Sequence, residues 1–239
     1  MQKLNKNKRI YRTLVVITGG ARGIGKSIAS SFLKEGAVVI VTSRNAKFTS
    51  SPVQEGNVNL QFLDVTNLNS VENFFKWLSD QKYVLSTFIN NAGTGIFKPI
   101  LETSLSEWEI IISTNLTGAF LCTKECFRIM QNLNGGRIIN IGSIADAIGI
   151  PCNSVYAASK SGLRGFSATL SEEGSINNIR VTYITLGAVY TDIWKKRKGF
   201  FKKDMIEKDN VSDIIIEIAK QPLNVRIDNI EITPGKKIL

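Results

Sequence analysis

The stretch TLVVITGGARGIG covers residues 13–25 and joins an apolar, β-branched run to a turn rich in glycine. The run is nearly continuous in valine and isoleucine, which is typical of a strand buried on both faces of a parallel sheet. Glycines let the backbone turn tightly and approach a pyrophosphate, and the first N–H groups of the helix that follows attract anions. The stretch therefore predicts a strand-turn-helix unit that binds a dinucleotide, with four contact positions: Gly19, Gly23, Ile24 and Gly25.

The glycine spacing in this turn is G-x3-G-x-G, whereas the common dinucleotide motif is G-x-G-x-x-G. A glycine-rich turn between a strand and a helix also occurs as a purely structural feature, and the motif alone leaves that alternative open. The dinucleotide prediction therefore depends on what the rest of the chain adds.

Six further short apolar runs alternate with segments of helical length. The expected strands cover residues 13–18, 38–42, 58–63, 86–90, 136–141, 179–185 and 227–232. The expected helices cover residues 23–35, 68–81, 104–132, 154–175 and 211–220. This alternation favours an α/β fold: a single doubly wound Rossmann domain whose seven-stranded, mainly parallel sheet has helices on both faces. The catalytic domain is expected at 13–239, after a basic N-terminal extension at 1–12.

The formal net charge of +10 is concentrated in three segments. Residues 1–12, 195–203 and 236–237 hold 13 of the 30 lysines and arginines and no acid, which leaves 17 bases against 20 acids elsewhere. Such local basicity is typical of docking segments or solubilising tails, and a nucleic-acid partner is not expected. Residues 188–210 are the least regular stretch and the expected substrate loop.

Composition excludes several kinds of site and location. No apolar run reaches the roughly 18 to 20 residues that cross a bilayer, and the N-terminus lacks the apolar core of a signal peptide, so a cytoplasmic protein without membrane contact is expected. The chain has no histidine, which removes Ser-His-Asp hydrolysis and His-based zinc sites. Its three cysteines make neither a disulfide framework nor a complete metal site, so no metal is expected.

The end of the second expected strand bears on the choice between NAD and NADP. An acid at this place binds the ribose 2′-hydroxyl of NAD, whereas a cation accepts the 2′-phosphate of NADP. The strand ends in Ser43 and Arg44 with no acid, and Arg22 in the glycine turn adds a second guanidinium. Because arginine binds phosphate with paired hydrogen bonds, NADP(H) is the expected cofactor. The alternative is that both arginines are solvated surface residues.

Small and polar residues follow the third and fourth expected strands. Asp64 and Val65 close the third strand, and Asn91, Ala92 and Gly93 follow the fourth. The carboxyl ends of parallel strands line the ligand crevice of an open α/β sheet. Small residues there let the backbone meet a cofactor, and a carboxylate can accept from an adenine amino group. All five positions are therefore expected to bind the cofactor.

The sequence YAASK places Tyr156 and Lys160 one helical turn apart, on one face of an expected helix. An ammonium near a phenol lowers the pKa of the phenol toward the range of a working proton donor, which gives a chain without histidine a general acid. Ser143 follows the fifth expected strand, where its hydroxyl can polarise a carbonyl oxygen. Asn115 lies within the helix expected at 104–132, where asparagine is a poor helix former, which suggests a role beyond helix formation.

In this order along the chain, these features resemble the short-chain dehydrogenase/reductase family over about residues 12–235. The resemblance rests on TGGARGIG at 18–25, NNAG at 90–93, Asn115, Ser143, Tyr156 and Lys160. It implies that Tyr156 is the catalytic acid/base and that Ser143 binds the reacting oxygen. It also implies that Lys160 holds the nicotinamide ribose and tunes Tyr156, while Asn115 supports a water relay.

The resemblance extends to the residues after the sixth expected strand. It implies that Val189 and Thr191 contact the nicotinamide carboxamide. The family's usual Pro-Gly pair before them reads Leu186-Gly187 here. This departure reduces backbone rigidity beside the nicotinamide but removes no catalytic group.

Together these features predict an NADPH-dependent reductase that transfers hydride to a ketone or aldehyde while Tyr156 protonates the oxygen. A 3-oxoacyl compound is the default substrate. The cations of residues 195–203 make an anionic or carrier-linked substrate one option, and a solvated basic loop is the other. Three other functions remain open: an NADP(H)-binding sensor or scaffold, an alcohol or sugar dehydrogenase working oxidatively, and an epimerase or dehydratase. The last fits less well, because such enzymes usually carry a second, substrate-binding domain and this chain is short for one.

The two longest expected helices carry apolar residues on more than one face, which favours assembly into a homodimer or homotetramer. The residues that suggest this are Ile110, Ile111, Phe120, Phe127, Leu163, Phe166 and Leu170.

Overall fold

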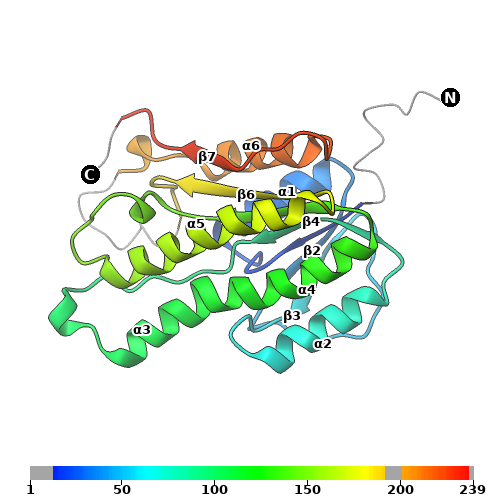
Figure 1. Cartoon of the computed structure of the whole chain (residues 1–239), viewed down its shortest axis with the longest axis horizontal. Coiled ribbons are helices and arrows are strands. Elements are labelled where there is room, and N and C mark those ends of the chain that lie inside the picture. Colours follow the sequence, from blue (N-terminus) through cyan, green and yellow to red (C-terminus); the bar gives the residue numbers. More distant parts are fainter. Residues whose placement is uncertain (1–12, 192–200, 237–239) are drawn as a thin grey trace.

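The computed structural model describes residues 13–191 and 201–236, so the basic extension at 1–12 and most of the 195–203 segment lie outside it. Seven parallel strands form one sheet in the order β3-β2-β1-β4-β5-β6-β7 (Figure 1). The strands are β1 (Thr13–Ile17), β2 (Val38–Ser43), β3 (Val58–Phe62), β4 (Val84–Asn90), β5 (Gly136–Ile141), β6 (Ile179–Leu186) and β7 (Asn229–Ile232). The doubly wound, seven-stranded fold is confirmed.

Helices cover both faces of this sheet (Figure 1). They are α1 (Gly23–Lys34), α2 (Leu68–Ser79), α3 (Leu105–Ile112), α4 (Gly118–Asn132), α5 (Ser154–Ser175) and α6 (Lys208–Lys220). Apolar side chains of α1 and α6 share one core cluster with one set of strand residues, and those of α2, α4 and α5 share another with the alternate set. Because side chains alternate across a strand, β1, β2, β4, β5 and β6 each supply both cores, which explains their continuous valine and isoleucine runs.

The helix expected at 104–132 is interrupted. Its start is as predicted, because Ser104 and Glu107 form a capping box at the beginning of α3. Residues Ser113–Thr117 then form one π-helical turn before α4 continues to Asn132. Such π turns often occur at functional sites, and this one contains Asn115.

The order of the strands reverses at β1, which lies between β2 and β4. In an open α/β sheet, the crevice at such a reversal, outside the carboxyl ends of the strands, is where ligands bind. The glycine turn after β1 and residues 91–93 after β4 border this crevice. Within residues 13–191 and 201–236, none of the helices is long and apolar enough to span a bilayer.

Candidate active site

The turn between β1 and α1 requires glycine at three positions. Gly19 and Gly23 have positive φ angles of 63° and 58°, which favour glycine. A Cβ atom at Gly19 would lie 2.9 Å from the Ala92 Cα atom, and one at Gly25 would lie 2.5 Å from the Asn91 Nδ2 atom. The turn therefore packs closely against the segment after β4, and the two segments border the same crevice.

Thr18 and Asn91 tie these two segments together. The Thr18 hydroxyl accepts hydrogen bonds of 3.0 Å from the backbone N–H groups of Asn91 and Ala92. The Asn91 side-chain amide donates to the carbonyl oxygens of Thr18 at 2.9 Å and Gly19 at 3.2 Å. Asn91 therefore supports the glycine turn with its side chain. Thr18 is not among the residues predicted from the sequence, because its only local signal is a hydroxyl directly before the first glycine.

The start of α1 fits a phosphate group. Arg22 occupies the N-cap position but makes no capping hydrogen bond with its side chain, and the first turn contains no acid. No heavy atom lies within 4 Å of the place of a Cβ at Gly23. The first N–H groups of α1, with the positive end of the helix dipole, thus have no side-chain cap, and the residues here fit the pyrophosphate of a dinucleotide.

The two arginines lie at neighbouring strand ends. The Gly20 N–H donates to the Thr42 carbonyl oxygen at 3.2 Å, which joins the glycine turn to the end of β2. Arg22 and Arg44 are both exposed, and neither has an ion-pair partner among the described residues. Ser43, beside Arg44, accepts a hydrogen bond from the Asn45 N–H. Both guanidinium groups are thus available to an anionic ligand.

Asp64 and Val65 lie at the end of β3, with separate structural contacts. One carboxylate oxygen of Asp64, Oδ1, accepts from the Thr66 N–H at 3.0 Å and the Thr66 hydroxyl at 2.8 Å. Val65 is buried against the first residue of α4, because a Cβ at Gly118 would lie 2.7 Å from its Cγ2 atom. The Oδ2 atom of Asp64 has no hydrogen-bond partner in the described part of the chain.

Tyr156, Lys160 and Ser143 meet at the end of β5. The buried Lys160 Nζ atom donates to the Ile141 carbonyl oxygen at 2.7 Å and lies 5.8 Å from the centroid of the Tyr156 ring. Ser143 occupies the turn after β5, and its side chain lies near enough to the Tyr156 phenol to affect its pKa. The Phe97 ring lies 5.5 Å from the Tyr156 ring, centroid to centroid. The three predicted side chains are therefore close together in one place.

Asn115 joins this group from the π turn. Its amide oxygen accepts from the Thr94 N–H at 2.8 Å, and its amide nitrogen donates to the Thr94 carbonyl oxygen at 2.9 Å and the Ser159 hydroxyl at 3.0 Å. The Ser159 hydroxyl donates in turn to the Tyr156 carbonyl oxygen at 2.7 Å. A Cβ at Gly93 would lie 3.5 Å from the Asn115 Oδ1 atom, so Gly93 also borders the site. Asn115 thus connects the segment after β4 to the first turn of α5.

The pKa of Tyr156 is raised, the opposite of the lowering that the sequence predicts. Burial is the main cause, the charge of Asp146 adds to it, and the hydrogen bond of Ser143 opposes it. Burial also lowers the pKa of Lys160 to about 8, which the charge of Asp146 opposes. The Lys160 ammonium hydrogen-bonds the Ile141 carbonyl oxygen, and desolvation has the largest effect on the pKa of the Tyr156 phenol. The phenol therefore stays protonated at neutral pH.

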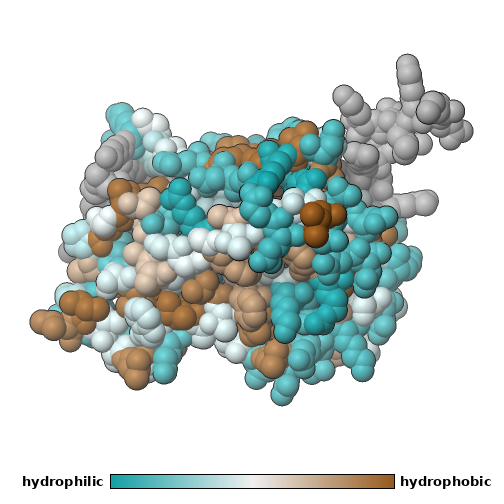
Figure 2. Space-filling view, viewed as in Figure 1, coloured by the Kyte–Doolittle hydropathy of each residue, from teal (hydrophilic) through white to brown (hydrophobic). Residues whose placement is uncertain are grey.

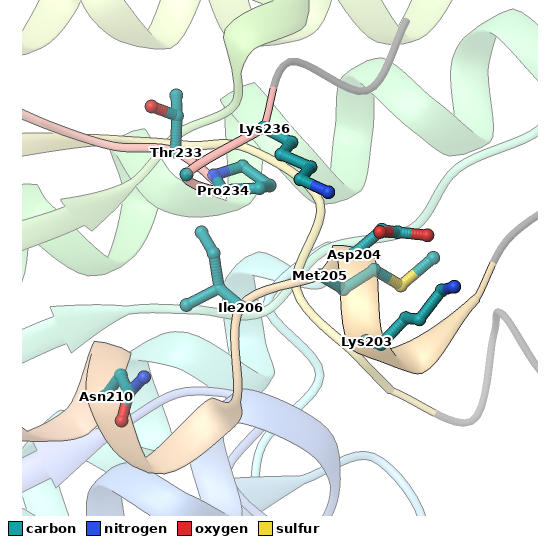
Figure 3. Close-up of a pocket in the computed structure, with 9 residues that line it drawn as sticks. Lys203, Asp204, Met205, Ile206, Asn210, Thr233, Pro234 and Lys236 are labelled. Carbon is teal, nitrogen blue, oxygen red and sulfur yellow. The ribbon is translucent and has the colours of Figure 1, made fainter.

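Val189 and Thr191 follow β6, and a pocket lies near them. Val189 is buried and forms a β-bridge with Ile206, whereas Thr191 is half-buried at the end of a described stretch. The pocket, of about 430 Å³, lies between residues 203–206 and the segment after β7 (Figure 3). Figure 3 shows Lys203 and Lys236 at its border, with Asp204 also lining it. The four residues of the proposed catalytic group do not line this pocket: Asn115, Ser143, Tyr156 and Lys160.

The fold and site define a nicotinamide-dependent type of oxidoreductase, and comparison with known proteins identifies the family. The model of the short chain dehydrogenase family matches residues 13–200. The chain is 32% identical to the 3-oxoacyl-[acyl-carrier-protein] reductase of Synechocystis sp. over 186 residues, which cover 75% of each protein. The chain therefore belongs to the short-chain dehydrogenase family, as its motifs predict.

Solved structures agree with this assignment. Serine dehydrogenase from Escherichia coli is 26% identical with a TM-score of 0.80, over 95% of this chain and 100% of that one. The structure of ElxO with NADP bound is also 26% identical with a TM-score of 0.80, over 92% of this chain and 97% of that one.

Proposed function

We propose that the protein is an NADPH-dependent carbonyl reductase that converts a ketone or aldehyde to an alcohol. The observation that carries the proposal is the convergence of Asn115, Ser143, Tyr156 and Lys160 beside Gly93, at the carboxyl ends of the central strands. A nicotinamide dinucleotide bound across the β1–β4 crevice would supply the hydride. Ser143 holds the carbonyl oxygen, and Tyr156 delivers the proton to it.

Reduction is the proposed working direction, and Tyr156 is the proposed proton donor. Carbonyl reduction requires a proton donor, whereas alcohol oxidation requires a base. The Tyr156 phenol holds its proton at neutral pH, and burial, which raises its pKa, reinforces this. Lys160 contacts the ribose, and Asn115 holds the site together and supports a water relay.

NADP(H) is the proposed cofactor, and each predicted contact residue has a role. Gly19, Gly23, Ile24 and Gly25 face the pyrophosphate, and Arg22, Ser43 and Arg44 the 2′-phosphate. Asp64 and Val65 lie at the adenine, and Asn91, Ala92, Gly93, Val189 and Thr191 border the nicotinamide side. The absence of an acid from residues 43–47 and the NADP in the ElxO structure support this choice.

The similarity to an acyl-carrier-protein reductase supports a 3-oxoacyl substrate, and the basic segment 195–203 is the reason to test an anionic or carrier-linked one. The cations at 195–200 lie outside the described residues. The similarity to a serine dehydrogenase supports a second candidate, a dehydrogenase that oxidises an alcohol. An NADP(H)-binding sensor without turnover is a third, and we place all three in the cytoplasm.

The test is a spectrophotometric assay of NADPH consumption with 3-oxoacyl, diketone, quinone and sugar carbonyl compounds, in matched anionic and neutral pairs. The reverse assay uses NADP⁺ with the corresponding alcohols. A carbonyl reductase consumes NADPH with one class, and an anionic substrate shows a KM that rises with ionic strength. Faster alcohol oxidation at neutral pH would favour the dehydrogenase. Binding of NADPH without turnover of any compound would overturn the enzymatic proposal.

A further inference from the structure

A buried carboxylate lies directly behind the proposed active site. Asp146 ends the short 3₁₀ helix that follows Ser143, and its side chain has an exposed fraction of 0%. It is the one polar residue in the sequence IADAI at 144–148. A buried carboxylate is unfavourable unless it is hydrogen-bonded or paired, so its contacts indicate what it does.

These contacts join three elements. The Asp146 Oδ1 atom lies 3.4 Å from the Arg164 Nη1 atom on α5, and its Oδ2 atom accepts from the Thr185 hydroxyl on β6, also at 3.4 Å. The Ser161 hydroxyl on α5 donates to the Asp146 carbonyl oxygen at 2.9 Å. The Ser143 turn is therefore held against α5 by the backbone carbonyl of Asp146, and the carboxylate adds contacts to α5 and β6. Both carboxylate contacts are long, and the Arg164 side chain is 44% exposed, so the charge is only partly offset.

The other groups that face this carboxylate belong to the site or adjoin it. They are Tyr156 and Lys160 on α5 and Tyr183 on β6, in addition to Arg164. The Tyr183 hydroxyl donates to the Lys160 carbonyl oxygen at 3.1 Å, and its ring fills the space next to Gly142. The negative charge of Asp146 raises the pKa of both Tyr156 and Lys160. It acts against the burial that makes the Lys160 ammonium unfavourable.

We propose that Asp146 is a positioning residue of the active site, whose buried carboxylate holds the Ser143 turn in place and stabilises the Lys160 ammonium. The proposal rests on the proposed function, because Lys160 is the group expected to hold the cofactor ribose. Without the carboxylate, Lys160 loses its proton at a lower pH, and the hydrogen bonds it donates as an ammonium are weakened there.

The test measures the dissociation constant of NADPH by fluorescence between pH 7 and 9.5. In the wild type, we expect affinity to fall as Lys160 loses its proton, with a midpoint near pH 8 because burial lowers the pKa of Lys160 to about 8. In Asp146→Asn, which keeps the shape and removes the charge, we expect the midpoint to fall by about one pH unit. Thr185→Val removes a hydrogen bond to the carboxylate but no charge, and its midpoint is expected to stay unchanged. Lys160→Met is expected to show no midpoint in this range.

Arg164→Gln is expected to shift the midpoint in the opposite direction. Arg164 is half exposed and partly offsets Asp146, so its neutralisation should move the midpoint upward. This variant decides the question if Asp146→Asn does not fold, which circular dichroism would show. Midpoints that stay at the wild-type value in both charge variants would overturn the role of Asp146 and leave the proposed function intact. A wild type that does not bind NADPH would overturn both.

Discussion

Lys160 is a buried lysine, and its burial links the site to stability. Folding lowers its pKa from 10.5 to about 8, so between these values the unfolded chain binds more protons than the folded one. Stability from this group therefore rises as pH increases through that window. The shift corresponds to roughly 3 kcal/mol. We expect the free energy of unfolding of the wild type to gain about this amount relative to Lys160→Met between pH 8 and 10.5, as measured by urea denaturation. A constant difference across the range would contradict the burial of a charged lysine.

The proposed preference for NADP(H) depends on Arg44. Arg44→Asp repels a 2′-phosphate and offers a carboxylate to a 2′-hydroxyl. We expect kcat/KM for NADPH to fall by a factor that corresponds to roughly 1 to 3 kcal/mol, and kcat/KM for NADH to stay unchanged or improve. The matched control is Lys82→Asp, the same change of charge at an exposed position before β4, and it should leave the ratio unchanged. Equal efficiencies with NADPH and NADH in the wild type would contradict the NADP assignment.

At the scale of elements, α1 depends on the absence of a side chain at Gly25. Alanine in a helix is normally more stable than glycine by roughly 0.5 to 1 kcal/mol. At Gly25 the added Cβ would lie 2.5 Å from the Asn91 amide and 2.9 Å from the Gly20 Cα atom. We therefore expect Gly25→Ala to lower the free energy of unfolding. Gly165→Ala on α5, where no atom lies within 4 Å, should raise it. The same sign for both in denaturant titrations would contradict the close packing of the turn.

Elements with a local signal were predicted from the sequence, and contacts between distant segments were not. The strands and the glycine turn follow from apolar runs and glycine spacing. The π turn has no such signal, because Asn115 makes its hydrogen bonds to Thr94 and to Ser159. The burial of Asp146 likewise depends on β6 and α5, far along the chain.

On the scale of the whole molecule, exposed apolar side chains gather toward one end. Figure 2 shows apolar side chains gathered where α3 begins, and Ile100, Leu101 and Leu105 are the most exposed of them. Among the residues expected to drive assembly, Ile110 and Phe120 are exposed. By contrast, Ile111, Leu163 and Leu170 are buried within the subunit, which corrects that part of the prediction.

We expect sedimentation to show a dimer or tetramer that Phe120→Asp weakens, because a charge on an apolar interface is unfavourable. Phe48→Asp is the control, since this phenylalanine is similarly exposed but lies after β2. A wild type of 26.4 kDa at micromolar concentration would contradict assembly.

The central claim is that this site reduces a carbonyl group with a proton from Tyr156. Its most direct test is a single-turnover measurement of wild type and Tyr156→Phe, each loaded with NADPH and mixed with the best carbonyl compound from the assay. Because phenylalanine keeps the ring and removes only the hydroxyl, we predict nearly equal NADPH affinity for both proteins. The wild type should form one alcohol per NADPH, and the variant should lose at least about two orders of magnitude in rate. Wild-type turnover by Tyr156→Phe would contradict the account.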